Sequence, residues 1–392
     1  MKRITSIAAG LVALTLVAAA CGGDDSGSSD TTAASTATTA ASTETTAGST
    51  ETTAGGAATT AAGAATTAAA SGEPMELDTN GDGKYVIGIA TPGPRNDGAY
   101  YQALVDGLTQ WSKDNGFEEP IVVDNIKPEE AQTSLDSLAR QGVDIIAVGA
   151  GEIADPLSEL TNTYSDVIWY CNCGAGFDQL PNLIQQGDDG SEISYTAGVA
   201  TGLLMKDSGG TKAAMIGNNN FNFEKETFGG FRIGLDEIDP SYDWTYVATG
   251  SFNDVAAATE AFNNLKDAGT NAIYPYLGGS HEAVVKLSNE NDIITMSAGA
   301  SNACERTDLD YQIAVRFDSG DYAIAIFDKM KSGDIQRGET YTFHVGVDPQ
   351  VGAVICDPTP EQKQAMDDAY AKVASGALDE QFGANKQQAY AG

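Results

Sequence analysis

The sequence predicts an α/β protein of two lobes, each a mostly parallel sheet flanked by helices, joined by a hinge of several strands. Three observations predict this fold class. Short apolar runs alternate with amphipathic stretches of helical length over residues 85–206, as in repeated β-α-β units. The same alternation restarts at residue 211 and continues to residue 299. The chain beyond residue 76 also exceeds the usual size of a single domain.

The N-terminus has the pattern of a secretory signal peptide. Lys2 and Arg3 precede a short apolar run, and three alanines stand directly before Cys21. We assign residues 1–20 to the signal peptide, because the run is too short for a membrane-spanning helix. Small residues before a cysteine resemble the bacterial lipobox, so we expect Cys21 to carry a lipid anchor on the extracytoplasmic face of the cell membrane. The alternative is an ordinary signal with an incidental cysteine.

Residues 21–76 are expected to form a disordered tether behind the lipidated cysteine. Between residues 26 and 71 the chain is nearly all Thr, Ala, Ser and Gly. Such a segment has too little apolar side-chain area to offset its ordering entropy. Its threonines permit O-glycosylation, which composition alone does not establish.

The first lobe is placed at residues 77–207 together with 314–392. Its repeated pattern of strand and helix implies a parallel sheet. The predicted strands are 85–90, 120–125, 143–150 and 166–171, and the predicted helices are 99–115, 129–142, 155–164 and 191–206.

The second lobe is placed at residues 208–313. Its predicted strands are 211–218, 242–250, 271–277 and 292–299, and its predicted helices are 224–238, 255–268 and 281–290. Segments 311–333 and 341–348 are expected to return to the first lobe, followed by a helix at 361–376. Ligands of open α/β sheets bind beyond the carboxyl ends of the strands, and here these ends would face each other across a cleft.

The charge and the cysteines both favour an extracytoplasmic protein. A formal net charge of −34 argues against nucleic acid or anionic lipid as a partner. Cys171, Cys173, Cys304 and Cys356 predict two disulfides in such a compartment. Cys171 and Cys173 are poor partners for each other on a strand, so we expect each to bond to Cys304 or Cys356. A zinc site is the alternative, but a CxC pair without a nearby histidine supports it weakly.

The sequence shows no catalytic motif. The chain has two histidines, and it lacks GxSxG, GxxxxGK[ST], HExxH and a complete GxGxxG. His281 could contact a ligand or begin a helix at the surface, and His344 lies in an alternating segment typical of a structural role. We therefore expect no enzyme activity, no catalytic residue and no cofactor.

The segment DTNGDGKY has acidic and amide residues at Asp78, Asn80 and Asp82, spaced as in calcium loops. The twelfth position of such a loop needs an acidic ligand, and here it is Ile89 inside a predicted strand. We interpret the segment as a polar turn and expect no metal; an isolated calcium site is the alternative.

The predicted strand ends combine aromatic residues with amides and acids, which suits a flat polar ligand. Any single aromatic could instead belong to the core. The candidate ligand-binding residues from these ends are Asn96, Asp97, Tyr100, Tyr101, Asn172, Phe177, Asn219, Phe221 and Gly278.

Several segments in order resemble one family. They are the small-residue triplet before Cys21, NDGAYYQALVDG, YTAGVATGLLMK, GGFRIGLDEIDP, GSFNDVAAATEAFNNLKDAGTNAIY and VRFDSGDYAIAIFDKMKSG. Together they resemble the basic membrane protein family of ABC-transporter substrate-binding lipoproteins, which includes purine nucleoside receptors. The resemblance covers nearly all of residues 84–376. It implies a two-lobed type I periplasmic-binding-protein fold and delivery of a ligand to a membrane permease.

The resemblance also implies roles for particular residues. The acid and aromatic of the family's first loop fall on Asp97 and Tyr100, and its hinge lysine, which contacts ligand hydroxyls, falls on Arg316. The sequence departs from the nucleoside-binding pattern at SAGASNAC, which lacks the family's acid, and at Tyr101, which replaces an asparagine.

We therefore expect a monomeric lipoprotein that closes on a nucleoside-like molecule. Tyr100 would stack on the ligand, Asp97 and Asn172 would form hydrogen bonds with it, and Arg316 would hold a hydroxyl or an anionic group. The alternatives are a sugar-binding lipoprotein of the ribose-binding type, and a surface sensor or interaction protein on the same fold.

Overall fold

The computed structural model describes residues 72–174 and 177–391. The expected signal peptide, Cys21 and nearly all of the expected tether lie outside the described residues. No helix in the described part of the chain has the length and apolar character needed to cross a membrane.

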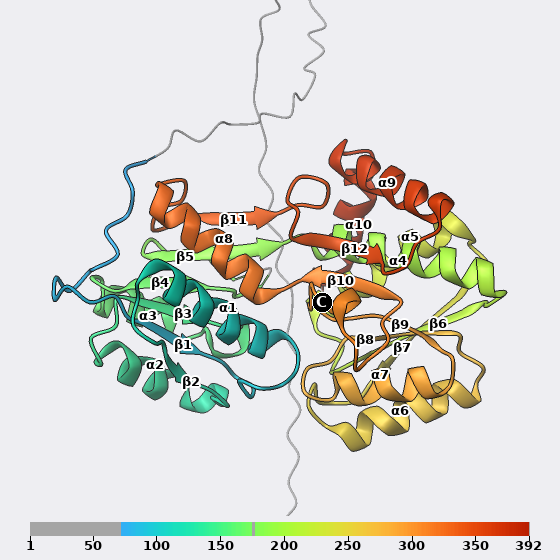
Figure 1. The fold of residues 1–392 in the computed structure, drawn as a ribbon, viewed down its shortest axis with the longest axis horizontal. Helices are drawn as coiled ribbons and strands as arrows, with labels where there is room; N and C mark the ends of the chain where they lie inside the picture. The colour runs from blue at the N-terminus through green and yellow to red at the C-terminus, as the bar shows by residue number, and fades with distance from the viewer. Residues whose placement is uncertain (1–71, 175–176, 392) are drawn as a thin grey trace, which may run out of the picture. The chain divides into compact units, whose positions relative to one another are not determined.

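In the described part of the chain, the first sheet has six strands, and every neighbouring pair in it is parallel (Figure 1). Its central strands are fully buried, which is usual for a parallel sheet covered on both faces. In spatial order the strands are β11 (Thr340–Phe343), β5 (Leu183–Asp188), β4 (Ile168–Cys171), β3 (Ile145–Val148), β1 (Ile87–Ala90) and β2 (Ile121–Val123).

Helices cover both faces of this sheet because alternate strand residues point to opposite sides. Ile87 and Ile89 share a core with α1 (Tyr100–Asn115) and α8 (Ser319–Ser332). Ile146 and Val148 share a separate core with α2 (Ala131–Ala139) and α3 (Leu157–Thr163). Short 3₁₀ turns, at Pro128–Glu130 and Gly151–Ile153, precede α2 and α3.

The second sheet is also parallel throughout and has four strands among the residues that the structure describes. In spatial order they are β7 (Asp243–Ala248), β6 (Lys212–Gly217), β8 (Ala272–Pro275) and β9 (Ile294–Thr295). One face packs against α6 (Val255–Asp267) and α7 (His281–Glu290), and the other packs against α4 (Gly190–Ser208) and α5 (Asn222–Ile238). The predicted α/β class, with parallel sheets flanked by helices, is confirmed.

The chain passes between the two groups of elements three times. It crosses from β5 into α4, from β10 (Ile313–Phe317) into α8, and from β11 into β12 (Val351–Ile355). β10 and β12 form an antiparallel pair, and β10 is also bridged to the segment after β9. The C-terminal helices α9 (Pro360–Ala374) and α10 (Asp379–Tyr390) follow β12.

The expected lobe assignment is wrong for α4 and for the C-terminal segment. We expected 190–207 and 344–392 to belong to the first lobe, but α4 packs against α5 and β12, and α10 also packs against α5 (Figure 1). The small residues of α4 allow the close approach of α5. A Cβ at Gly198 would overlap the carbonyl oxygen of Phe231 on α5.

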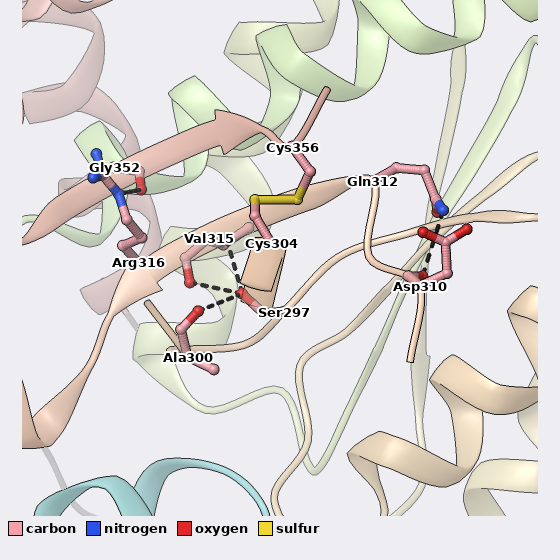
Figure 2. Close-up of a disulfide and its surroundings, with 9 residues drawn as sticks. All are labelled: Ser297, Ala300, Cys304, Asp310, Gln312, Val315, Arg316, Gly352 and Cys356. Atoms are coloured by element: carbon pink, nitrogen blue, oxygen red, sulfur yellow. Dashed lines mark hydrogen bonds between the residues drawn. A yellow bond between two sulfur atoms is a disulfide. The ribbon is translucent and has the colours of Figure 1, made fainter. Parts of the chain in front are cut away.

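The expected disulfide pairing is also wrong. Cys171 bonds to Cys173, and Cys304 bonds to Cys356, as Figure 2 shows for the second pair. β4 ends at Cys171, so Cys173 does not follow the strand alternation that would separate the two side chains. Cys304 lies in the 3₁₀ turn Ala303–Glu305, and Cys356 directly follows β12.

Candidate functional site

A cavity of about 480 Å³ lies where the chain leaves the strands of both sheets. Its lining comes from segments that follow β1, β3 and β4 of the first sheet and β6, β7 and β8 of the second, together with two of the crossovers. The lining residues on which the argument depends are Tyr100, Tyr101, Glu152, Asn172, Phe177, Asp188, Phe221, Phe223, Glu226, Phe252, Tyr276, Gly278 and Phe317.

Aromatic rings form a continuous series across this cavity. The Phe221 and Phe223 rings are stacked with their centroids 5.6 Å apart, and Phe223 lies 6.2 Å from Tyr276. Tyr276 is stacked on Phe317 at 5.8 Å, and Phe317 lies 6.3 Å from Tyr100. The series therefore connects residues of α5, the loop after β8, the β10 crossover and the start of α1.

Two of these rings are unusually exposed for their size. Phe221 and Phe223 keep 42% and 37% of their surface accessible to solvent. Large apolar side chains that remain accessible inside a concave site are typical of surfaces that bind a partner or ligand. We infer that the two rings are available for stacking.

Three carboxylates share the cavity with the rings. Glu152 follows β3, Asp188 ends β5 and Glu226 belongs to α5. Burial raises the pKa of all three, and it brings the pKa of Asp188 to about 6. The Tyr322 hydroxyl donates to Asp188 at 3.0 Å, which opposes the rise, whereas the nearby charges of Glu226 and Asp189 add to it.

The raised pKa of Asp188 predicts a pH-dependent cost in stability. Its pKa of about 6 in the folded protein lies above the ordinary value of about 4, so the folded state holds this proton more tightly than the unfolded state does. The stabilisation of the folded state by this proton is therefore complete below pH ~4, and it is lost as the pH rises through ~6. Asp188→Asn should raise the free energy of unfolding by roughly 2 kcal/mol at pH 7.5.

Urea denaturation of the parent and Asp188→Asn at several pH values tests this. The difference in free energy of unfolding should shrink toward zero near pH 4. Glu260→Gln, a change at an exposed carboxylate on α6, serves as the matched control and should leave the stability unchanged. An Asp188→Asn protein that is less stable than the parent at pH 7.5 would contradict the assignment.

The structure brings six of the candidate residues from the sequence to the cavity. They are Tyr100, Tyr101, Asn172, Phe177, Phe221 and Gly278. The Asn172 amide donates to the Tyr100 hydroxyl, and the Ser319 hydroxyl of α8 donates to the Tyr100 carbonyl. The first contact holds the side chain of Tyr100 at the end of β4, and the second holds its backbone against the start of α8.

Asp97 does not line the cavity. Its carboxylate accepts hydrogen bonds from the backbone N–H groups of Ala99 at 2.9 Å and Gln102 at 3.0 Å. It therefore satisfies free donors at the start of α1, as a capping residue does. The sequence suggests a ligand contact here because an acid beside two tyrosines resembles a binding loop.

Arg316, Asn96 and Asn219 also lie outside the cavity lining. Arg316 donates to the Tyr370 hydroxyl at 2.9 Å and to the carbonyls of Val351 and Gly352 at 3.3 Å, so its guanidinium ties β10 to β12 and α9. Asn96 and Asn219 are exposed. The backbone N–H of Asn219 donates to Glu224 at 3.2 Å, as part of the turn before α5.

The two histidines have structural contacts. His281 begins α7 but is buried, and its Nδ1 lies 2.7 Å from the Pro275 carbonyl. Burial lowers its pKa to about 4. His344 lies just beyond β11, half exposed, with Nδ1 3.0 Å from Glu192, which raises its pKa.

His344 belongs to the one group of metal-ligating side chains found among the described residues. It lies with Asp189 and Glu192, and the possible ligand atoms are within 4.8 Å of one another. Asp189 is paired with Lys386 of α10, and Glu192 accepts from the Val345 N–H at 2.9 Å. Glu192 therefore already ties α4 to the crossover between β11 and β12, and Asp189 ties the start of α4 to α10.

The segment DTNGDGKY forms the predicted polar turn. The Asp78 carboxylate accepts from the N–H groups of Gly81 at 2.8 Å and Gly83 at 3.0 Å, and Asp82 accepts from Lys84 at 2.8 Å. Its acids thus satisfy the backbone of the turn itself.

The candidates chosen from the sequence leave out several residues of the cavity lining, among them Glu152, Asp188, Phe223, Glu226, Phe252, Tyr276 and Phe317. Asp188 was missed because β5 was not recognised as a strand. The signal was available, since LIQQGDDG is a short run that ends in acids and glycine, but Gln185 and Gln186 made it look like a loop. Both glutamines are in fact buried.

Comparison with known proteins gives one family. The profile described as "Bmp: ABC transporter substrate-binding protein PnrA-like" matches residues 84–365. A solute-binding protein of an ABC transporter system from Conexibacter woesei DSM 14684 is similar in structure, with 19% identity and a TM-score of 0.58, covering 75% of this chain and 97% of that one.

Two further solved structures are similar. A solute-binding protein of an ABC transporter system from Aeropyrum pernix K1 has 12% identity and a TM-score of 0.64, covering 78% of this chain and 99% of that one. A periplasmic binding protein/LacI transcriptional regulator from Alkaliphilus metalliredigens QYMF, complexed with D-xylulofuranose, has 15% identity and a TM-score of 0.50, covering 70% and 100%. At these identities the likeness shows the type I periplasmic-binding fold.

Proposed function

Because the chain belongs to the Bmp family of PnrA-like ABC transporter substrate-binding proteins, we propose that it is the extracytoplasmic, lipid-anchored binding component of an importer. It captures a small, flat, polar ligand of nucleoside-like shape and delivers it to a permease. The family is one of binding proteins, not of enzymes. The observation that carries the proposal is the aromatic cavity at the strand ends of both sheets.

The size and lining of the cavity support a small-molecule ligand. Its volume of about 480 Å³ lies within the usual range for ligand pockets. Rings from the start of α1, the loop after β8 and the β10 crossover would contact a flat ligand from several sides. A ligand that bridges both groups of elements would favour closure about the three crossovers, as in hinge-type binding proteins.

A thermal-shift panel of nucleosides, free bases, flavins, pentoses and amino acids tests the proposal. At least one flat heterocycle should raise the melting temperature in a concentration-dependent way. Ultraviolet difference spectra then separate a stacked heterocycle from a pentose, which has no absorbing ring. A panel in which no compound raises the melting temperature would overturn the proposed function, and a panel in which only pentoses do so would favour the sugar-binding alternative.

Phe223→Ala should weaken binding of the panel's best flat ligand by about 10- to 100-fold, since a stacking contact of this kind is worth roughly 1–3 kcal/mol. The free protein should lose little stability because the ring is already 37% exposed. Isothermal titration calorimetry measures the affinity and urea denaturation the stability. Val347→Ala is the matched control: Val347 is 69% exposed and outside the cavity lining, so this change should alter neither. Equal effects of the two variants on binding would contradict the stacking role.

A further inference from the structure

We propose that the ligand is a flat organic cation, held between the aromatic rings with its positive charge facing the carboxylates of Asp188, Glu226 and Glu152. This inference rests on the proposed function and adds the charge of the ligand to it.

The first argument is the charge of the cavity lining. Among the described residues, three carboxylates belong to the lining, and no Lys, Arg or His does. The Lys386 ammonium group is paired with Asp189, outside the lining, and its charge also acts on Glu226. The single ammonium group of Lys386, already paired with Asp189, does not balance the three carboxylates of the lining. The cavity therefore has an excess of negative charge.

The second argument is the remaining hydrogen-bonding capacity of these acids. Asp188 accepts from the Tyr322 hydroxyl through Oδ2, and within the described part of the chain no donor reaches its Oδ1. Glu226 accepts from the N–H and hydroxyl of Ser191 at 3.1 Å through Oε1. An ionised carboxylate accepts hydrogen bonds through both oxygens, so Asp188 retains an acceptor for a ligand.

The third argument is the aromatic wall. Ring faces carry negative charge density and attract cations, and the attraction grows when both partners are desolvated. Tyr276 and Phe317 form one stacked pair, and Phe221, Phe223 and Phe252 form another group of nearly parallel rings. Rings combined with carboxylates favour a charged flat molecule over a neutral one.

A neutral ligand would leave the charge of the site uncompensated. Its hydroxyl or N–H groups could donate to one or two carboxylates, but closure would still remove ionised acids from water without an opposite charge. Burial and the neighbouring acids already raise the pKa of Asp188 to about 6. A bound cation relieves that repulsion and favours the ionised form.

The test uses pairs of probes that share their shape and differ in charge. Calorimetry at pH 7.5 compares 1-methyladenosine, a cation, with its neutral isomer N6-methyladenosine, and the cation 1-methylnicotinamide with neutral N-methylnicotinamide. The cationic member of a pair should bind at least about tenfold more tightly. Asp188→Asn, which is expected to fold at least as stably as the parent, should remove most of that preference. Glu260→Gln should leave it intact.

The outcomes separate this inference from the proposed function. If only neutral or anionic compounds bind, in these pairs or in the wider panel, the cationic ligand is excluded while the transport function stands. A preference for cations that survives in both Asp188→Asn and Asp188→Asn/Glu226→Gln would overturn the role of the carboxylates. If no compound of either set binds, the proposed function itself fails.

Discussion

Replacing Cys304 and Cys356 together by alanine lowers the free energy of unfolding by about 4 kcal/mol. The two cysteines are 52 positions apart in the sequence, so their bond removes a large loop-closure entropy from the unfolded chain. The bond joins the turn after β9 to the residue after β12, beside the β10–β12 pair (Figure 2). Cys304 is exposed and Cys356 half-buried, so little packing is lost with the sulfurs.

The second disulfide provides the matched comparison. Cys171 and Cys173 are two residues apart, so the loop-entropy contribution of their bond is at most about 2 kcal/mol. Urea denaturation of both double-alanine variants, with and without reductant, measures the difference. Reductant should bring the parent down to the stability of a protein without either bond. A larger loss from the short loop than from the long one would contradict the entropic account.

Gly234→Ala should destabilise the protein by roughly 2–3 kcal/mol. Gly234 lies where α5 crosses α4, and a Cβ there would overlap the carbonyl oxygen of Tyr195 and lie 2.7 Å from the Val199 nitrogen. Both obstacles are backbone atoms of a buried helix, so they cannot be relieved by turning a side chain. The two helices would have to separate, which would disturb the buried stacking of Phe231 on Trp244 at 4.0 Å.

Gly383→Ala is the control for this substitution. Gly383 also lies in a helix, α10, but a Cβ there would meet no atom within 4 Å. The added methyl reduces the freedom of the unfolded chain, so this variant should gain about 0.4–1 kcal/mol. Thermal and urea denaturation measure both variants. If both variants shift stability in the same direction, the close contact between α4 and α5 is not the cause.

The crossing of α4 and α5 also affects where two of the cavity carboxylates lie. α4 begins directly after Asp188 and Asp189, and Glu226 lies in the second turn of α5, accepting from Ser191 of α4. A shift between these helices would therefore move two of the three cavity carboxylates. We expect the glycine contacts to set the spacing of those acids.

Several parts of the fold and the site are predictable from local pattern. Apolar runs that alternate with amphipathic stretches specify parallel strands and their covering helices. A strand buried on both faces is a continuous apolar run, whereas a helix buried on one face has apolar residues at every third or fourth position. Strand ends could then be located, and with them Tyr100, Asn172, Phe177, Phe221 and Gly278. Parallel strands bring their carboxyl ends to one edge, so residues far apart in the chain could be grouped without a structure.

The local sequence pattern did not predict which polar residues face the cavity. Asp97 and Arg316 have residue types that suit a ligand, but their side chains are used by the ends of α1 and by the β10–β12 pair. A buried polar side chain forms hydrogen bonds with the donors and acceptors that lie nearest to it, and tertiary contacts decide which groups those are. Asp188, in contrast, lines the cavity but was not predicted. It ends a strand with two buried glutamines, and such a strand does not have an apolar pattern.

The sequence by itself determined the α/β class, the parallel order of strand and helix, and the aromatic character of the strand ends, since each follows from local side-chain periodicity. Only the tertiary structure decided which lobe receives α4 and the C-terminal helices, which cysteines pair, and which acids face the cavity. The lobe assignment, the Cys304–Cys356 bond and the choice of cavity acids depend on the close approach of segments far apart in the chain, such as Gly198 on Phe231 and Tyr322 on Asp188. The Cys171–Cys173 bond depends instead on the end of β4 at Cys171. No local pattern encodes the distance between two such segments.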